Sequence, residues 1–259
     1  MKSTYPRMPA IFLGHGNPML AIESNPYAKD WEALGQSLLK PRAVLMVSAH
    51  WMTRGTSVTA MSHPETIHDF GGFPKALFEV QYPAPGSPPL ASQVKELLAP
   101  IPVHLEEQEW GLDHGAWAVL KFLFPNADVP IVQLSLDASL TALEHYELAK
   151  KLKSLRDDGV LIVASGNVVH NLRTVDFSSQ AQYPWAVRFN EFFKEKLLAY
   201  QFNELIEPVH PDANISIPTP EHYWPAIYIL AQMEGQEAIQ IVTDGIDIGS
   251  ISMLSFRIG

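Results

Sequence analysis

Four short apolar runs, separated by helical patterns, constrain the fold of this 259-residue chain more than any other feature. The runs cover residues 10–13, 43–48, 130–134 and 160–164. They are rich in β-branched residues and leucine and lack polar alternation, which is typical of strands covered on both faces. The helical patterns cover residues 27–39, 90–98, 139–155 and 185–200. Strands that alternate with helices predict an α/β fold with a central, mostly parallel sheet flanked by helices.

The chain shows no internal repeat, no low-complexity tract and no obvious linker. Hydrophobic residues make up 47% of the sequence, which is ample for a sizeable core. The 21 prolines are spread through the loops and do not mark a hinge. We therefore expect one domain over residues 1–259. Polar and apolar residues alternate over 250–258 well enough to predict a last strand, which could lie at an edge of the sheet.

Charge and cysteine content exclude several classes of partner and chemistry. The net charge of −10 and the pI near 5.4 argue against nucleic acid or an anionic membrane as the main partner. Because the chain has no cysteine, a thiolate nucleophile is excluded, and a bound metal must be held by His, Asp or Glu. No apolar run is long enough for a signal sequence or a membrane span, so the expected compartment is the cytoplasm.

Three of the ten histidines closely follow predicted strands. These are His15, His50 and His170. In open α/β sheets, ligands bind in the crevice beyond the carboxyl ends of the strands. Glycines beside His15 and before His170 would let the backbone approach a ligand closely. A single histidine in such a place is more often a hydrogen-bonded core or loop residue, but three in the same topological position favour a shared site.

Two further histidines are predicted at helix starts. Thr219 could cap a helix whose first turn contains His222, and Asp113 could cap one that begins at His114. The positive end of a helix dipole disfavours imidazolium, which keeps the ring neutral as a metal ligand must be. The alternatives are a simple capping turn at His222 and a loop histidine packed among aromatic residues at His114.

The other histidines have less specific surroundings. His145 is expected on a solvated, charged helix face, and His104 follows a short apolar run. His63 and His210 neighbour prolines in loops. His68 opens a glycine-rich aromatic loop that could cover an aromatic substrate or be purely structural. Phosphate-binding glycine motifs and a serine-nucleophile elbow are missing from the sequence, so we expect no nucleotide cofactor.

The motifs taken together resemble those of a known family. They are LGHGNPM (13–19), SAHW (48–51), IHDFGGFP (67–74), YPAPG (82–86), WGLDHG (110–115), ASGNVVHN (164–171) and PTPEHY (218–223). The chain resembles the extradiol ring-cleaving dioxygenases related to the catalytic subunit of protocatechuate 4,5-dioxygenase, over nearly its whole length. Within them it is most similar to the subgroup of bacterial and plant enzymes that cleave DOPA.

The resemblance implies roles for five histidines. His15, His50 and His222 would bind the metal. His170 matches a histidine that is either a fourth ligand or the acid–base residue. His114 matches one that contacts substrate or dioxygen.

The metal that the resemblance implies is divalent. In the broader family the third ligand is a carboxylate, and Glu221 stands next to His222 in the matching stretch. His222 is favoured because the DOPA-cleaving subgroup has histidine there. Fe(II) is expected, since dioxygen chemistry needs a redox-active ion with open positions. Zn(II) binds nitrogen-rich sites more tightly and is expected to occupy the same site, without redox chemistry.

The implied partners are a small catechol and O2, with L-DOPA giving 4,5-seco-DOPA and then betalamic acid. Two other functions use the same histidines. One is a zinc-dependent hydrolase, in which the metal would activate water. The other is a non-catalytic metal-binding relative, against which the presence of both His170 and His114 speaks, because merely holding a metal needs no additional base.

Overall fold

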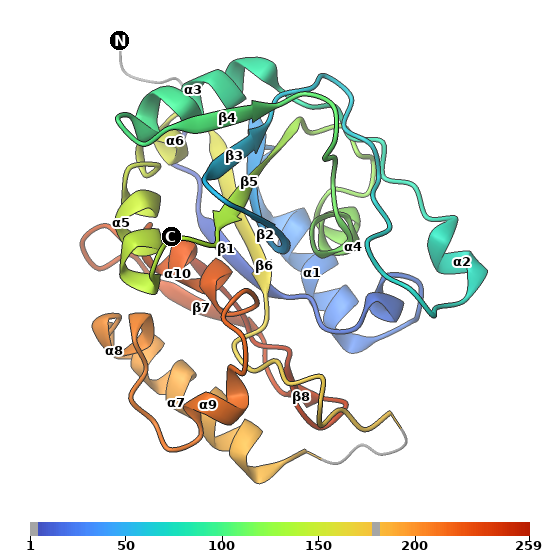
Figure 1. Cartoon of the computed structure of the whole chain (residues 1–259), viewed down its shortest axis with the longest axis vertical. Helices are drawn as coiled ribbons and strands as arrows, with labels where there is room; N and C mark the ends of the chain where they lie inside the picture. Colours follow the sequence, from blue (N-terminus) through green and yellow to red (C-terminus); the bar gives the residue numbers. More distant parts are fainter. Residues whose placement is uncertain (1–4, 178–181) are drawn as a thin grey trace.

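The computed structural model describes residues 5–177 and 182–259, which form an α/β fold around one large sheet (Figure 1). Residues 1–4 and 178–181 of the expected domain lie outside the described residues. The strands are β1 (Ala10–Gly14), β2 (Ala43–Thr53), β3 (Thr56–Thr59), β4 (Val103–Glu106), β5 (Ile131–Asp137), β6 (Val160–Gly166), β7 (Ile239–Thr243), β8 (Ile246–Asp247), β9 (Ile251–Ser252) and β10 (Ser255–Ile258).

Eight of these strands form the sheet in the order β4-β3-β5-β2-β6-β1-β10-β7. The central four, β5, β2, β6 and β1, are parallel, as the four apolar runs predict. Antiparallel pairs lie on both sides of them, between β3 and β5 and among β1, β10 and β7. The C-terminal strand β10 is therefore interior, and β7 occupies the edge instead, because β7 supplies the second set of hydrogen bonds that β10 needs.

Helices cover both faces of the sheet. They are η1 (Pro18–Ala21), α1 (Pro26–Ser37), α2 (Lys75–Phe78), α3 (Pro88–Leu98), α4 (His114–Leu123), α5 (Ala142–Lys150), α6 (Ser154–Asp157), α7 (Pro184–Leu198), α8 (Asn203–Ile206), α9 (Ala213–Ser216) and α10 (Trp224–Leu230). Helices α1 and α4 pack on one face, and α3, α5, α7 and α10 pack on the other. The predicted layers are confirmed.

Alternate residues of each central strand enter opposite halves of the core. In β1, Phe12 packs on the α10 side and Leu13 packs on the α4 side, and Leu45 and Met46 divide in the same way in β2. All four side chains are fully buried. This alternation holds the sheet between its two helical layers, so that the carboxyl ends of the parallel strands form a rigid platform.

Side-chain caps mark the starts of several helices. Helix α3 begins two residues before the predicted range of 90–98, because Ser87 caps it and its hydroxyl accepts the N–H of Leu90. The predicted helix over 139–155 is instead two helices, α5 and α6, joined by a turn. Thr141 and Glu144 form a reciprocal capping box that starts α5 inside the predicted range.

The prediction for His145 is wrong. Its side chain is fully buried, and its Nδ1 lies 2.9 Å from the hydroxyl of Tyr228 on α10. The ring also packs against Trp224. Burial lowers the pKa of His145 to about 4. Periodicity within α5 placed this histidine beside glutamates, but the neighbouring α10 covers that position.

Among the described residues, no helix combines the length and apolarity needed to cross a bilayer.

Candidate metal centre

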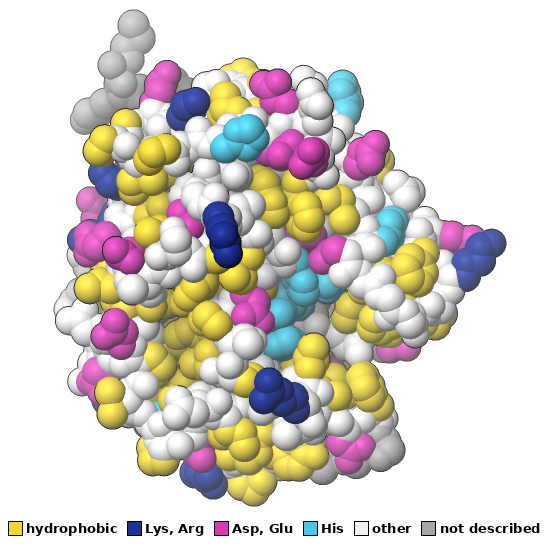
Figure 2. Space-filling model, viewed as in Figure 1, with side chains coloured by type: hydrophobic (Ala, Val, Ile, Leu, Met, Phe, Trp, Pro, Cys, Tyr) yellow, Lys and Arg dark blue, Asp and Glu magenta, His cyan; other side chains and the backbone are white. Residues whose placement is uncertain are grey.

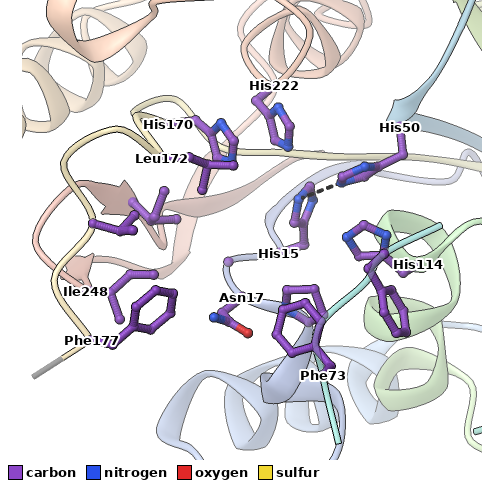
Figure 3. A pocket seen from close by; sticks show the side chains of 15 residues that line it. His15, Asn17, His50, Phe73, His114, His170, Leu172, Phe177, His222 and Ile248 are labelled. Carbon is purple, nitrogen blue, oxygen red and sulfur yellow. Dashed lines mark hydrogen bonds between the residues drawn. The ribbon is translucent and has the colours of Figure 1, made fainter. Parts of the chain in front are cut away.

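Five histidine side chains converge beyond the carboxyl ends of the parallel strands (Figure 3). His15 directly follows β1, and His170 follows β6, as predicted. The backbone N–H of His170 donates to the carbonyl of Ser216, which ties this loop to the α9 segment. Because β2, β6 and β1 are neighbours in the sheet, the three histidines reach the same crevice.

His50 lies inside β2, which is longer than the predicted run over 43–48. The pairing of β2 with β5 shifts register between Val47 and Met52. Such irregularities bend a strand and redirect its side chains, and they often occur beside active sites. The imidazole of His50 consequently turns into the crevice, where its Nε2 lies 3.3 Å from Nε2 of His15.

His114 is the first residue of α4, and Asp113 is the N-cap, as predicted. The Asp113 carboxylate accepts the N–H of Ala116 and is fully buried, where it also accepts hydrogen bonds from Ser48 and Gln133. Burial raises the pKa of Asp113 to about 6, although its hydrogen bonds oppose this shift. This cap joins the start of α4 to β2 and holds the ring of His114 3.8 Å from that of His50, measured between centroids.

His222 precedes α10 and does not lie within it. The predicted cap at Thr219 is wrong, because α10 begins only at Trp224. The Thr219 hydroxyl donates to the Glu221 carboxylate, which in turn lies 3.1 Å from Nδ1 of His222. The carbonyl of His222 accepts the N–H of Asn167, and a side chain at Gly166 would clash with that carbonyl. The absence of a side chain at Gly166 therefore allows the His222 turn to pack on the end of β6.

The donor set fits one divalent metal ion. Ring nitrogens of His15, His50 and His114 form one group of possible ligand atoms within 4.8 Å of one another. Ring nitrogens of His170 and His222 and a carboxylate oxygen of Glu221 form a second such group. The ring of His222 joins the two groups, at 5.3 Å from His15 and 5.0 Å from His50 between centroids. Two nitrogens about 2.1 Å from one ion at a tetrahedral angle are about 3.4 Å apart. The nitrogens of His15 and His50 have this separation.

The rings of His170 and His222 are stacked, with centroids 3.4 Å apart and planes inclined by 5°. An imidazole binds a metal in the plane of its ring, because the nitrogen lone pair lies in that plane. One ion cannot lie in two nearly parallel planes this far apart. In this arrangement only one of the two histidines can therefore be a ligand of a given ion.

The surroundings keep four of the five imidazoles neutral. Burial and the neighbouring histidines lower the pKa of His15 and of His222 well below the usual value. Burial is also the main reason why the pKa of His50 falls to about 3 and that of His170 to about 4. Neutral imidazoles are the form that binds metal, so the crevice presents its nitrogens ready for a cation.

Asp69 links two of the histidines from the outside. Its Oδ1 accepts the backbone N–H of His114 at 2.8 Å and lies 2.9 Å from Nδ1 of the same residue. Its Oδ2 lies 3.4 Å from Nδ1 of His50. Burial acts to raise the pKa of Asp69, but contacts with His114 and His50 outweigh burial and lower it. An ionised Asp69 favours a proton on Nδ1 of both rings, which leaves Nε2 free to bind a ligand.

The histidines lie at the bottom of a cavity of about 360 Å³ that opens to the surface (Figure 2). Phe70 and Phe73, from the glycine-rich loop singled out in the sequence, line one wall. His68 of that loop instead packs against Trp117 and lies 2.9 Å from the carbonyl of Val80. The opposite wall is aliphatic and aromatic, and consists of Leu172, Val175, Phe177, Ile248 and Ile251.

Sequence reasoning missed three groups of this site. Asp69 stood in a loop noted only for its aromatic residues. Ser165, at the end of β6, was not assigned to the site, but its hydroxyl lies 2.8 Å from Nδ1 of His15. The apolar wall formed by 172–177 and 248–251 carries no sequence signal, because loops far apart in the chain build it.

Comparison with known proteins decides the family. The model of the catalytic LigB subunit of aromatic ring-opening dioxygenase matches residues 9–256. The chain belongs to this family. The family acts on small aromatic molecules with dioxygen. Such chemistry needs a metal site, and the histidine cluster could hold a metal ion.

The relatives support this membership over the full length. A protein of Escherichia coli K12 named 4,5-DOPA dioxygenase extradiol is 54% identical over 100% of this chain and 97% of its own length. One of the same name from Beta vulgaris is 35% identical over 95% of each chain. A crystal structure of an uncharacterized protein from E. coli K12 superposes with a TM-score of 0.87 at 49% identity, covering 98% of this chain and 100% of that chain.

Proposed function

We propose that this protein is an Fe(II)-dependent extradiol dioxygenase that opens a catechol ring with O2. The convergence of five histidine imidazoles at the bottom of an open cavity is the observation that carries the proposal. Bound Fe(II) would supply a redox-active centre with open positions for the catechol oxygens and for O2. Zn(II) would bind the same nitrogens without supplying redox chemistry.

The ligands that we propose are His15, His50 and His222. His222 is preferred to His170 because its ring lies close to those of both His15 and His50, whereas His170 is stacked behind it. Glu221 then orients His222 through Nδ1. This choice leaves His170 and His114 to act on the substrate.

The proposed catalytic residues hold and move protons. Burial keeps His170 neutral, so its ring nitrogen can accept a proton from a catechol hydroxyl and return it when the ring opens. His114 lines the cavity next to Phe70, and Asp69 fixes its orientation. With its Nδ1 proton directed at Asp69, His114 would present Nε2 to accept a hydrogen bond from a catechol hydroxyl.

L-DOPA is the proposed substrate on the strength of the relatives' names. Cleavage would give 4,5-seco-DOPA, which cyclises to betalamic acid without further catalysis. The cavity volume of about 360 Å³ suits a ligand with a single ring and a short side chain. A cytoplasmic location remains part of the proposal.

Exchange of the metal tests the reaction type. Fe(II)-loaded protein should consume about one O2 per catechol, and Zn(II)-loaded protein should consume none, because zinc cannot give an electron to dioxygen. An oxygen electrode, with the metal content of each sample measured in parallel, provides the readout. Equal oxygen consumption by both forms would contradict the proposal, and release of a hydrolysis product by the zinc form would favour a hydrolase.

Asp69→Asn should weaken metal binding or catalysis, although Asp69 is not one of the proposed metal ligands. The variant keeps the shape of the side chain but loses the charge that orients His50 and His114. Metal affinity or kcat should fall about 10- to 100-fold, the usual effect of removing such a partner. The control is Asp128→Asn, since Asp128 pairs with Lys40 at the surface. A metal Kd and a kcat both within twofold of those of the unchanged protein would show that Asp69 does not position the histidines.

A further inference from the structure

The walls of the cavity contain almost no charge to receive a charged substrate. Among the residues that the structure describes, no Lys, Arg, Asp or Glu side chain lines it, and the polar lining consists of the histidines and Asn17. The ring substituent of a bound catechol would therefore extend into apolar surroundings (Figure 3).

The charged groups that contact the histidines of the cavity have the wrong sign for a carboxylate. Asp69 contacts His50 and His114, and Glu221 contacts His222. Both are acids that would repel the carboxylate of an amino acid. Its ammonium group would find these acids already engaged by histidine. Transferring an unpaired charge from water into such a cavity is unfavourable.

Two large apolar side chains at the cavity are unusually exposed. Leu172 is 63% exposed and Phe177 is 71% exposed, and both lie on the wall opposite the aromatic loop. Exposed apolar surface at the rim of a cavity is a mark of ligand binding. An apolar ring substituent would cover this surface, whereas a zwitterionic one would not.

We infer that the protein prefers catechols whose ring substituent is uncharged and apolar, such as a short alkyl group, over zwitterionic L-DOPA. The inference rests on the proposed function for the position of the catechol hydroxyls at the histidines. Phe177, Leu172 and Ile248 are the residues that determine the preference. L-DOPA remains a substrate, but with weaker binding.

Binding to redox-inactive protein tests the inference apart from turnover. Zn(II)-loaded protein is titrated calorimetrically, without oxygen and at pH 7, with 4-propylcatechol, 3-(3,4-dihydroxyphenyl)propionate, dopamine and L-DOPA. 4-Propylcatechol should bind at least about tenfold more tightly than each charged ligand, and each further methylene should add about three- to fourfold. Equal or tighter binding of a charged ligand, or no binding of any catechol, would overturn the inference.

Variants at the apolar wall provide the second readout. Leu172→Ala and Phe177→Ala should each lower the ratio of 4-propylcatechol affinity to catechol affinity about three- to tenfold. Leu143→Ala is the matched control, because Leu143 is an exposed leucine on α5 that is not part of the cavity lining. Leu172→Arg should raise the affinity for the propionate relative to 4-propylcatechol. Unchanged ratios in all three wall variants would show that these residues do not contact the substituent.

The cation closest in sequence to the apolar wall requires a separate test. It is Arg173, which follows Leu172 and is exposed at the surface. A preference for the propionate that disappears in Arg173→Gln would identify this residue as a carboxylate anchor and would overturn the inference.

Oxygen uptake by Fe(II)-loaded protein separates failure of this inference from failure of the proposed function. No uptake with any catechol would refute the proposed function, while the binding order would still decide the substrate class.

Discussion

His15→Ala and His50→Ala should each lose metal and activity together. Each variant removes one of three proposed ligands, and the Nε2 atoms of His15 and His50 lie only 3.3 Å apart in the unchanged protein. Loss of a direct ligand should lower metal affinity by more than the roughly 10- to 100-fold that loss of an orienting partner costs. Metal content after gel filtration and the metal-dependent rise in Tm provide two readouts, because a bound metal stabilises the folded state.

The matched control for both variants is His104→Ala. His104 lies on β4 at the far edge of the sheet, where its side chain is 69% exposed. This control should keep metal, Tm shift and activity. Circular dichroism of the metal-free variants separates loss of a ligand from loss of the fold. Full metal occupancy in both His15→Ala and His50→Ala would show that the metal binds elsewhere.

His170→Ala should keep the metal but lose most of the rate. If His170 is a base, the single-turnover rate should fall about 10²- to 10⁴-fold, the usual contribution of a positioned acid–base group. Metal content should stay at the level of the unchanged protein, because the proposed ligands His15, His50 and His222 would still hold the ion. Metal loss in proportion to rate loss would instead identify His170 as a fourth ligand.

The pH–rate profile adds a signature that a purely structural role would not produce. A base acts in its deprotonated form, so the rate should rise as pH increases through its pKa. Burial lowers the pKa of His170 to about 4, so this acidic limb should lie below the value of about 6.5 for an ordinary histidine. The limb should vanish in His170→Ala. His170→Gln, which restores volume and polarity without a base, should not rescue it.

The layered fold could be derived from the sequence because its signals are local. Four buried apolar runs became the four central parallel strands, and Asp113 capped the helix that it predicted. The strand-end rule likewise brought His15 and His170 to one crevice, since carboxyl ends of neighbouring parallel strands must meet. Local spacing alone determined these features.

The tertiary structure decided which of these histidines act together and what surrounds them. His145 is buried because α10 packs over α5, a contact that no periodicity within α5 reveals. Asp69 reaches His50 and His114 only because its loop folds against the start of α4. The apolar wall joins Leu172 and Phe177 to Ile248, about seventy residues later in the chain. Contacts between distant loops depend on packing of the whole chain, so the polarity of the substrate cavity was not readable from the sequence.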